Sequence, residues 1–181
     1  SRIEHHAVLH SIEELQKTFK VDVEFVNFQE NGLVDMGHLE NLLSSSKEKT
    51  LVTLMHVNNE IGNKLDLKRV AMLCKEYEAL FHSDTVQSVG HFHLDLSDIP
   101  IDFAAASAHK FHGPKGIGFA FIRKSSGIRP LIHGGEQERG LRAGTEPVHQ
   151  IVGLVKALDL AYENLEDETA YIKSVKNYCI E

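Results

Sequence analysis

The sequence predicts an α/β protein with a mainly parallel sheet in a three-layer α/β/α arrangement. Two observations predict this fold. Helical and strand-like patterns alternate along the 181 residues, as they do when helices connect the strands of a parallel sheet. Short polar segments also follow several of the apolar strands, which is typical of the carboxyl edge of such a sheet, where ligands bind.

The first elements are indicated by periodicity and by capping residues. Apolar residues recur at helical spacing over residues 4–17, which predicts a helix. Residues 21–28 predict a short strand, and residues 29–32 predict a turn. Asp35 is then expected to cap the N-terminus of a helix that continues to Leu43.

The middle of the chain predicts the sheet itself. Residues 51–55 are apolar and rich in strand-forming residues, a composition typical of a strand that is buried on both faces. Residues 67–74 predict an amphipathic helix. Three further strands are expected at residues 79–82, 101–106 and 116–123.

The C-terminal part predicts one long helix. Pro147 stands at a position favoured in a first helical turn, and apolar residues continue at helical spacing through Leu165. We expect a large domain over residues 1–146 and a connecting helix over residues 147–181 that leads toward a small domain. The chain begins without Met and ends within a helical pattern, so we expect a segment of a longer polypeptide.

Composition limits the classes of protein and partner. Apolar residues make up 42% of the chain, which is typical of a folded domain. The net charge of −7 argues against nucleic acid or an anionic membrane as the main partner. No apolar run is long enough to span a membrane. Cys74 and Cys179 are far apart and suggest a reducing compartment, so we expect a cytoplasmic protein.

Three polar segments are expected at one edge of the sheet, at residues 56–60, 83–87 and 107–110. Lys110 is the most informative residue among them. A lysine near hydroxyl and imidazole groups can act as a nucleophile toward a carbonyl and form a Schiff base. A surface lysine at a turn is the alternative.

Asp84 complements this lysine. A carboxylate at the end of a strand can pair with a protonated ring nitrogen and so turn a pyridine ring into an electron sink. Gln87, three residues later, would then contact a substituent of the ring. The alternative is an ordinary helix-capping aspartate.

Two other patterns carry less weight. The glycines of residues 113–118 lack the Gly-Lys-Ser/Thr ending of a nucleotide-binding loop and precede a strand, so a turn is the better interpretation. The histidines at residues 5–6 and 91–93 have no carboxylate or cysteine at a metal-binding spacing, so we expect no metal site there.

Five segments, taken together, resemble one enzyme family. They share the residues and the order of the cysteine desulfurases, which are class V aminotransferase-like enzymes of fold type I that depend on pyridoxal 5′-phosphate (PLP). The Ser-x-His-Lys and Arg-x-Gly-Thr motifs are the most specific parts of the resemblance. The segments are residues 4–9, 56–62, 84–90, 107–118 and 133–145.

The resemblance implies a cofactor and roles for residues that touch its ring. PLP would be the cofactor, bound covalently to Lys110. His5 would stack on the pyridine ring and help to move protons, and Asp84 would pair with the ring nitrogen.

It also implies the remaining contacts of the cofactor. Asn59 and Gln87 would contact the side of the ring that carries the phenolic oxygen. Ser107 and His109 would hold the phosphate. Thr145 would reach the phosphate of the PLP in the neighbouring subunit, which implies a homodimer with shared sites.

The activity that follows from the resemblance is conversion of L-cysteine to L-alanine. The sulfur would pass as persulfide to an acceptor protein, such as an iron–sulfur scaffold for iron–sulfur cluster assembly, or to tRNA thiolation. The sulfur-accepting cysteine is expected beyond residue 181. Cys74 and Cys179 are therefore expected to be structural, and this segment alone to be inactive.

Two alternatives to a cysteine desulfurase stay open at this point. A selenocysteine lyase or another class V aminotransferase would use the same PLP-binding residues. A non-catalytic scaffold that retains the fold is the other alternative, and the presence of Lys110 beside its ring partners argues against it.

Overall fold

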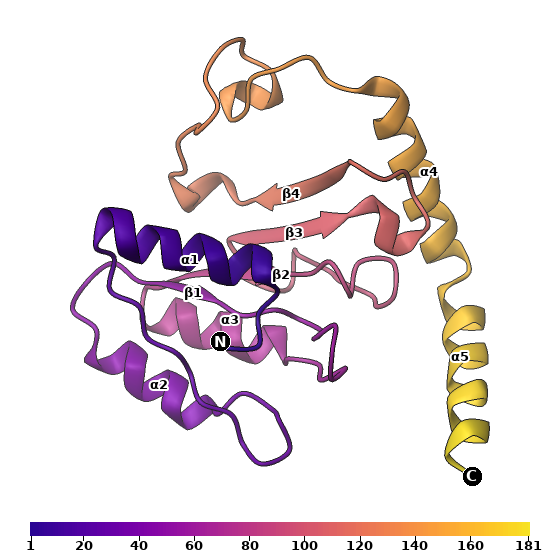
Figure 1. Cartoon of the computed structure of the whole chain (residues 1–181), viewed down its shortest axis with the longest axis horizontal. Coiled ribbons are helices and arrows are strands. Elements are labelled where there is room, and N and C mark those ends of the chain that lie inside the picture. The colour runs from indigo at the N-terminus through magenta and orange to yellow at the C-terminus, as the bar shows by residue number, and fades with distance from the viewer.

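A four-stranded sheet forms the centre of the computed structural model, which describes residues 1–124 and 126–181 in full (Figure 1). The strand order is β1–β2–β3–β4. The first three strands are parallel and β4 is antiparallel to β3, so the sheet is mainly parallel, as predicted. The strands are β1 (Leu51–Thr53), β2 (Leu80–Asp84), β3 (Phe103–Ser107) and β4 (Gly118–Ile122).

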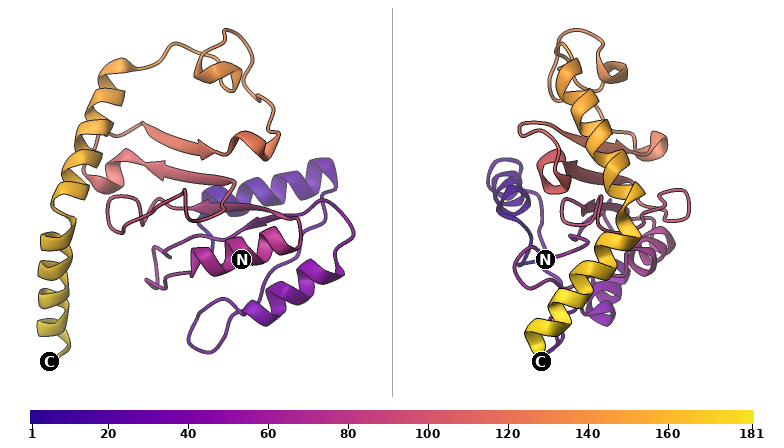
Figure 2. Two further views of the ribbon diagram at one scale, coloured as in Figure 1. Left: turned by 180° about the vertical axis from the view of Figure 1, so that it is seen from behind. Right: turned by 90° about the vertical axis from the view of Figure 1, so that its right-hand side faces the viewer.

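Helices lie on both faces of this sheet. Helices α2 and α3 cover one face and α1 lies over the other, which gives the three predicted layers (Figure 2). Helix α4 packs beside the short 3₁₀ helix η1 that follows β3, and α5 extends away from the sheet (Figure 1). The bounds are α1 (His6–Phe19), α2 (Met36–Ser45), α3 (Leu67–Glu76), η1 (Ala108–Phe111), α4 (Val148–Glu163) and α5 (Leu165–Ile180).

The main core lies between the sheet and the pair α2 and α3. Phe81 from β2, Val70 from α3 and Ile101 before β3 are all fully buried there. A second, smaller core joins the carboxyl end of β3 to α4 and includes Phe111 and Leu154. The two cores therefore fix the end of β3 from two sides.

The predicted helices at the N-terminus and in the middle of the chain are confirmed. Asp35 and Asp66 both cap helices, because their side chains accept hydrogen bonds from the backbone N–H groups of His38 and Arg69. The turn at residues 29–32 also forms: the N–H of Gly32 donates to the carbonyl of Gln29.

The strand predicted at residues 21–28 was wrong. Only Phe28 makes a bridge, an isolated antiparallel pair with Val34. The N–H of Asn27 donates instead to Nδ1 of His38 on α2. The pattern was strand-like, but the backbone of this segment bonds to a side chain rather than to a neighbouring strand.

The prediction of a single helix from residue 147 was also wrong. Two helices form there, and Asn164 separates α4 from α5. This residue has φ −103° and ψ 7°, and its side chain donates to the carbonyl of Leu160 at the end of α4. Acidic residues then fill the first turn of α5, where the helix dipole favours negative charge; they are Glu166, Asp167 and Glu168.

The expectation of a strand buried on both faces at residues 51–55 holds only in part. Val52, Leu54 and Met55 are buried, but Leu51 is 55% exposed. β1 lies at an edge of the described sheet. Within the described residues, no helix has both the length and the apolar character needed to cross a membrane.

Replacing Phe81 with alanine is expected to lower the free energy of unfolding by about 3–5 kcal/mol, because the side chain has no exposed surface. Denaturant unfolding followed by circular dichroism measures this loss. Met72→Ala on α3 is the matched control, since Met72 is 53% exposed, and it should cost about 0.5 kcal/mol or less. Equal losses in both variants would contradict this description of the core.

Candidate functional site

The parallel register brings the three polar segments to one edge of the sheet. The backbone N–H of His56, beyond β1, donates to the carbonyl of Asp84 at 2.9 Å. The N–H of Thr85 donates to the carbonyl of Ala105 in β3 at 3.0 Å. The polar segments that follow β1, β2 and β3 are therefore neighbours, as the sequence predicted.

Strand alternation decides which face the site occupies. Phe81 and Ser83 point into the core that contains α3, so His82 and Asp84 point toward the face covered by α1. Ala105 pairs with Asp84, and Ser107, two residues further along β3, shares that face. Asp84 and Ser107 thus lie on the same face of neighbouring strands.

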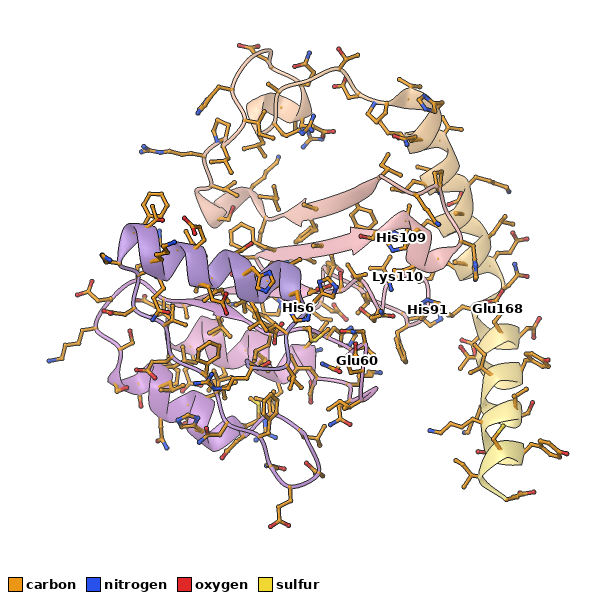
Figure 3. The ribbon with its side chains drawn as sticks, viewed as in Figure 1. His6, Glu60, His91, His109, Lys110 and Glu168 are labelled. Carbon is orange, nitrogen blue, oxygen red and sulfur yellow. The ribbon has the colours of Figure 1, made fainter. Side chains whose placement is uncertain are left out.

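Lys110 and His109 come directly after β3, on η1. Ala108 and Phe111 of this short helix are buried in the smaller core, whereas His109 and Lys110 are exposed. Burial at the two ends of the helix therefore presents the two polar side chains to solvent at the carboxyl end of β3. In Figure 3 they lie at the same end of the sheet as Glu60 and His6.

His5 lies at the N-terminus of α1, and its Nδ1 accepts a hydrogen bond from the N–H of Ala7 at 3.1 Å. Asn58 connects this segment to the sheet edge, because its Nδ2 donates to the carbonyl of Ile3 at 2.7 Å. The neighbouring Asn59 is exposed and donates to Oε1 of Glu60.

The sequence predicted a polar segment at residues 56–60 but no separate role for Asn58. It is buried, and its Oδ1 accepts from the N–H groups of Glu60 and Ile61 at 2.8 and 2.9 Å. An asparagine that bonds to the backbone two or three residues later is a standard turn former. Its place directly before a polar run at a strand end was the available signal.

The burial of His56 was not predicted either. This residue is 3% exposed, and its Nδ1 is buried with no hydrogen-bond partner among the described residues. Burial, and secondarily the positive charge of Lys64, lowers the pKa of His56 from 6.5 to about 4. Val52, Leu54 and His56 alternate along one face, a pattern that could have indicated the burial.

Thr145 lies apart from the other predicted site residues. It is exposed in the segment between the 3₁₀ helix Glu138–Gly140 and α4, and that segment runs above β4 in Figure 1. Gln87 is half-buried in the turn after Asp84. One chain therefore gathers Lys110, Asp84 and their neighbours at the sheet edge but not Thr145.

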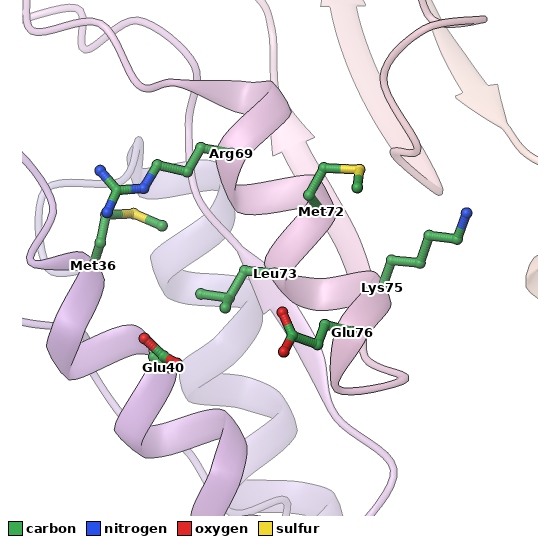
Figure 4. A pocket seen from close by; sticks show the side chains of 7 residues that line it. All are labelled: Met36, Glu40, Arg69, Met72, Leu73, Lys75 and Glu76. Carbon is green, nitrogen blue, oxygen red and sulfur yellow. The ribbon is translucent and has the colours of Figure 1, made fainter.

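A pocket of about 560 Å³ lies elsewhere, between α2 and α3 (Figure 4). It contains none of the predicted site residues; its lining is Met36, Glu40, Arg69, Met72, Leu73, Lys75 and Glu76. Among the described residues, no group of three or more His, Cys, Asp or Glu side chains is arranged to hold a metal ion.

The two cysteines differ in environment. Cys74 is 1% exposed on α3, and burial raises the pKa of its thiol to about 12. The packing role expected for Cys74 is therefore confirmed. Cys179 is exposed on α5, so the same expectation was wrong for Cys179 within this chain.

The fold and the site define a class of protein: an α/β domain with a lysine, a carboxylate, a serine and a histidine at the carboxyl edge of its sheet. The model of the aminotransferase class-V family matches residues 1–181. The chain belongs to this family, in agreement with the resemblance noted in the sequence.

Its curated relatives include proteins named cysteine desulfurase IscS. The chain is 43% identical over 181 residues to the one from Clostridium botulinum (strain Kyoto / Type A2), a match that covers 99% of this chain and 45% of that protein. It is 40% identical over 180 residues to the one from Dictyoglomus turgidum, with coverage of 99% and 45%. The chain therefore spans slightly less than half the length of these relatives.

Solved structures agree on the fold. A NifS-like protein superposes with a TM-score of 0.93 at 39% identity, over 98% of this chain and 48% of that chain. The NifS-like protein from Rickettsia africae ESF-5 gives a TM-score of 0.84 at 33% identity, over 97% of this chain and 50% of that chain.

The low pKa of His56 predicts a pH-dependent stability. The unfolded chain takes up a proton near pH 6.5, but the folded chain resists it until about pH 4. Stability should therefore fall as the pH drops from about 6.5 to about 4, by on the order of 2–3 kcal/mol. Denaturant unfolding across this range, compared with His56→Gln, measures the effect.

The comparison with His56→Gln is essential, because burial also lowers the pKa of His82. Only the difference between the two proteins isolates His56. An NMR titration of the His56 ring gives the pKa directly, and a midpoint near 6.5 would contradict the described burial.

Proposed function

We propose that this chain forms the PLP-binding part of a cysteine desulfurase that converts L-cysteine to L-alanine and transfers the sulfur as persulfide. The observation that carries the proposal is the position of Lys110, on η1 directly beyond β3, with Asp84 and Ser107 on neighbouring strands. The curated relatives named cysteine desulfurase support the choice of reaction.

The residues at this edge fit the chemistry of PLP. Asp84 is 9% exposed, and its Oδ1 accepts from the N–H of Val86, which fixes a carboxylate that can pair with a ring nitrogen. The side chains of Gln87, Ser107 and His109 make no hydrogen bonds within the part of the chain that the structure describes, so they are available to a ligand. An amine, a carboxylate and phosphate donors form the set that this cofactor requires.

Each residue would contribute a distinct action. The Lys110 amine would hold the cofactor covalently and, once released by the substrate amine, would take the proton from Cα and return it. Asp84 would keep a positive charge on the ring nitrogen. When bound, PLP would supply an electron sink for the charge left at Cα.

The other residues would bind and orient the cofactor. His5 would stack on the ring and assist proton movement, while Asn59 and Gln87 would contact the phenolic oxygen. Ser107 and His109 would donate hydrogen bonds to the phosphate. These roles rest on the resemblance in sequence, and the common location of these residues supports them, since the segments that carry them meet at one sheet edge.

The sulfur transfer needs a thiolate that this chain does not supply well. In the proposed reaction, a thiolate attacks the sulfur of the substrate, the C–S bond breaks, and the carbon retains the electrons and is protonated to alanine. The thiol of Cys74 is buried with a pKa of about 12, and a thiol is nucleophilic only as thiolate. Cys179 is exposed, but it lies in the last turn of α5, which extends away from the sheet (Figure 1). We therefore propose that the attacking cysteine lies outside residues 1–181, and that these residues alone would bind PLP weakly and be inactive.

The proposal extends to partners and location. Thr145, exposed and apart from the other site residues, would contact the PLP phosphate of a second subunit in a homodimer. Residues 1–146 would form the cofactor-binding domain and residues 147–181 a connection to a small domain. An iron–sulfur scaffold or a tRNA-thiolating protein would accept the sulfur, in the cytoplasm, where two free cysteines stay reduced.

Lys110 is expected to carry the cofactor. The whole protein is incubated with PLP, reduced with borohydride and digested, and mass spectrometry of the peptides locates the label. We expect the label on Lys110 and its loss in Lys110→Ala, whereas Lys115→Ala, which removes an exposed lysine five residues away, should be labelled normally. A label absent from Lys110 in the unaltered protein would favour a scaffold.

Turnover of L-cysteine tests the reaction class. The whole protein should release alanine, and added thiol should release the persulfide sulfur as sulfide. Lys110→Ala should lower the rate of alanine formation by roughly 10²–10⁴-fold, because a general base is removed. A related class V enzyme would give a different combination of results. Lys110 would be labelled, and the protein would turn over selenocysteine, or an amino-acid and keto-acid pair, but not cysteine.

A further inference from the structure

Two short segments carry the residues that would contact the cofactor ring. Residues 84–91 comprise the last residue of β2, Asp84, and the turn after it with Gln87, and η1 carries Lys110. Backbone bonds to neighbouring parts of the sheet hold the start of each segment: the N–H of Thr85 donates to the carbonyl of Ala105, and the N–H of Ala108 donates to the carbonyl of Ile117, directly before β4. Beyond the sheet, Val89 of the first segment packs with Ala108 and Phe111 of η1 in the smaller core, and one polar contact also joins the two segments.

His91 supplies such a contact. Its Nε2 lies 3.0 Å from the carbonyl oxygen of Lys110, and the two side chains lie next to each other in Figure 3. A carbonyl oxygen can only accept a hydrogen bond, so Nε2 of His91 must carry the proton. The bond reaches the backbone of Lys110 and leaves the amine of its side chain free.

The segment that carries His91 is itself held by a series of hydrogen bonds. The N–H of His91 donates to the carbonyl of Ser88 at 3.0 Å, and the N–H of Ser88 donates to the carbonyl of Thr85 at 2.9 Å. Thr85 in turn donates through both its N–H and its hydroxyl to the carbonyl of Ala105 in β3. His91 is thus connected to β3 through a rigid turn.

Gly90 lets this turn approach η1 closely. Its φ is +80°, and a Cβ atom at this position would lie 2.7 Å from Cβ of Phe111 and 3.3 Å from Cβ of Ala161. Any larger residue would therefore push the turn away from η1 and from α4. The contact between His91 and Lys110 requires this close approach.

We propose that His91 is a positioning residue for Lys110: it joins the segment that carries Asp84 and Gln87 to the segment that carries the lysine, and so fixes where the amine lies relative to the cofactor ring. This inference rests on the proposed function. The next two residues, by contrast, contact α4 and α5, and these contacts would serve a purely structural role. The hydroxyl of Tyr162 on α4 donates to the carbonyl of Phe92.

Three variants separate these roles. His91→Ala removes the bond to Lys110. His91→Gln restores a donor, because the side-chain nitrogen of glutamine is the same number of bonds from Cα. His93→Ala is the matched control two residues further along the chain, since His93 faces Glu166 of α5 and is not bonded to η1.

Two properties are measured for each variant of the whole protein. Amide hydrogen exchange of residues 108–113, without PLP, reports the anchoring of η1, and titration with PLP reports its affinity. Loss of one hydrogen bond should speed exchange and weaken PLP binding by roughly fivefold each in His91→Ala. His91→Gln should return both values close to those of the unaltered protein, and His93→Ala should change neither.

The outcomes distinguish this inference from the proposed function. Unchanged exchange and unchanged PLP affinity in His91→Ala, with Lys110 still labelled by PLP, would overturn the positioning role alone. A loss of affinity in His91→Ala that His91→Gln does not rescue would also overturn it. Absence of PLP from Lys110 in the unaltered protein would overturn the proposed function and this inference with it.

Discussion

The site depends on the parallel register of β1, β2 and β3. Phe81 and Ser83 must point into the core, so alternation forces Asp84 onto the opposite face, and Ala105 opposite Asp84 brings Ser107 to the same face. A shift of one residue would turn Asp84 into the core and leave a carboxylate buried among apolar side chains. The burial of Phe81 that stabilises the fold therefore also aims the carboxylate.

Beyond the strands, the site depends on close packing at the end of β3. Gly118 begins β4 where a side chain would collide with the carbonyl of Ala106, so β4 can pair with β3 as far as Ser107. Ala108 and Phe111 then anchor η1 and leave His109 and Lys110 exposed between them. Small residues near the lysine thus allow its backbone to be fixed while its side chain stays free.

The sequence could predict the elements whose signals are local. Capping by Asp35, the apolar spacing of the helices and the polar residues after the strands all depend on near neighbours in the chain. The segment at residues 21–28 has a strand-like pattern as well, but a strand requires a partner, and no local signal specifies that Asn27 bonds to His38 instead. The division at Asn164 was hidden because apolar spacing continues across it, while Asn164 leaves helical geometry and its side chain bonds to the carbonyl of Leu160. The same limit applies to the site: the polar segments could be found, but not the bond between His91 and Lys110, because it joins two residues that are far apart in sequence.

The location of His5 shows how one contact can serve both the fold and the proposed chemistry. Its Nδ1 accepts the N–H of Ala7 and so satisfies one of the free donors at the start of α1. Because that lone pair is engaged, the ring can keep this contact only with its exchangeable proton on Nε2. The hydrogen bond from Asn58 to Ile3 holds the preceding segment against the sheet edge, close to the loop that carries Asn59. Proton transfer by His5 would therefore proceed through Nε2, while Nδ1 keeps the helix and the ring in place.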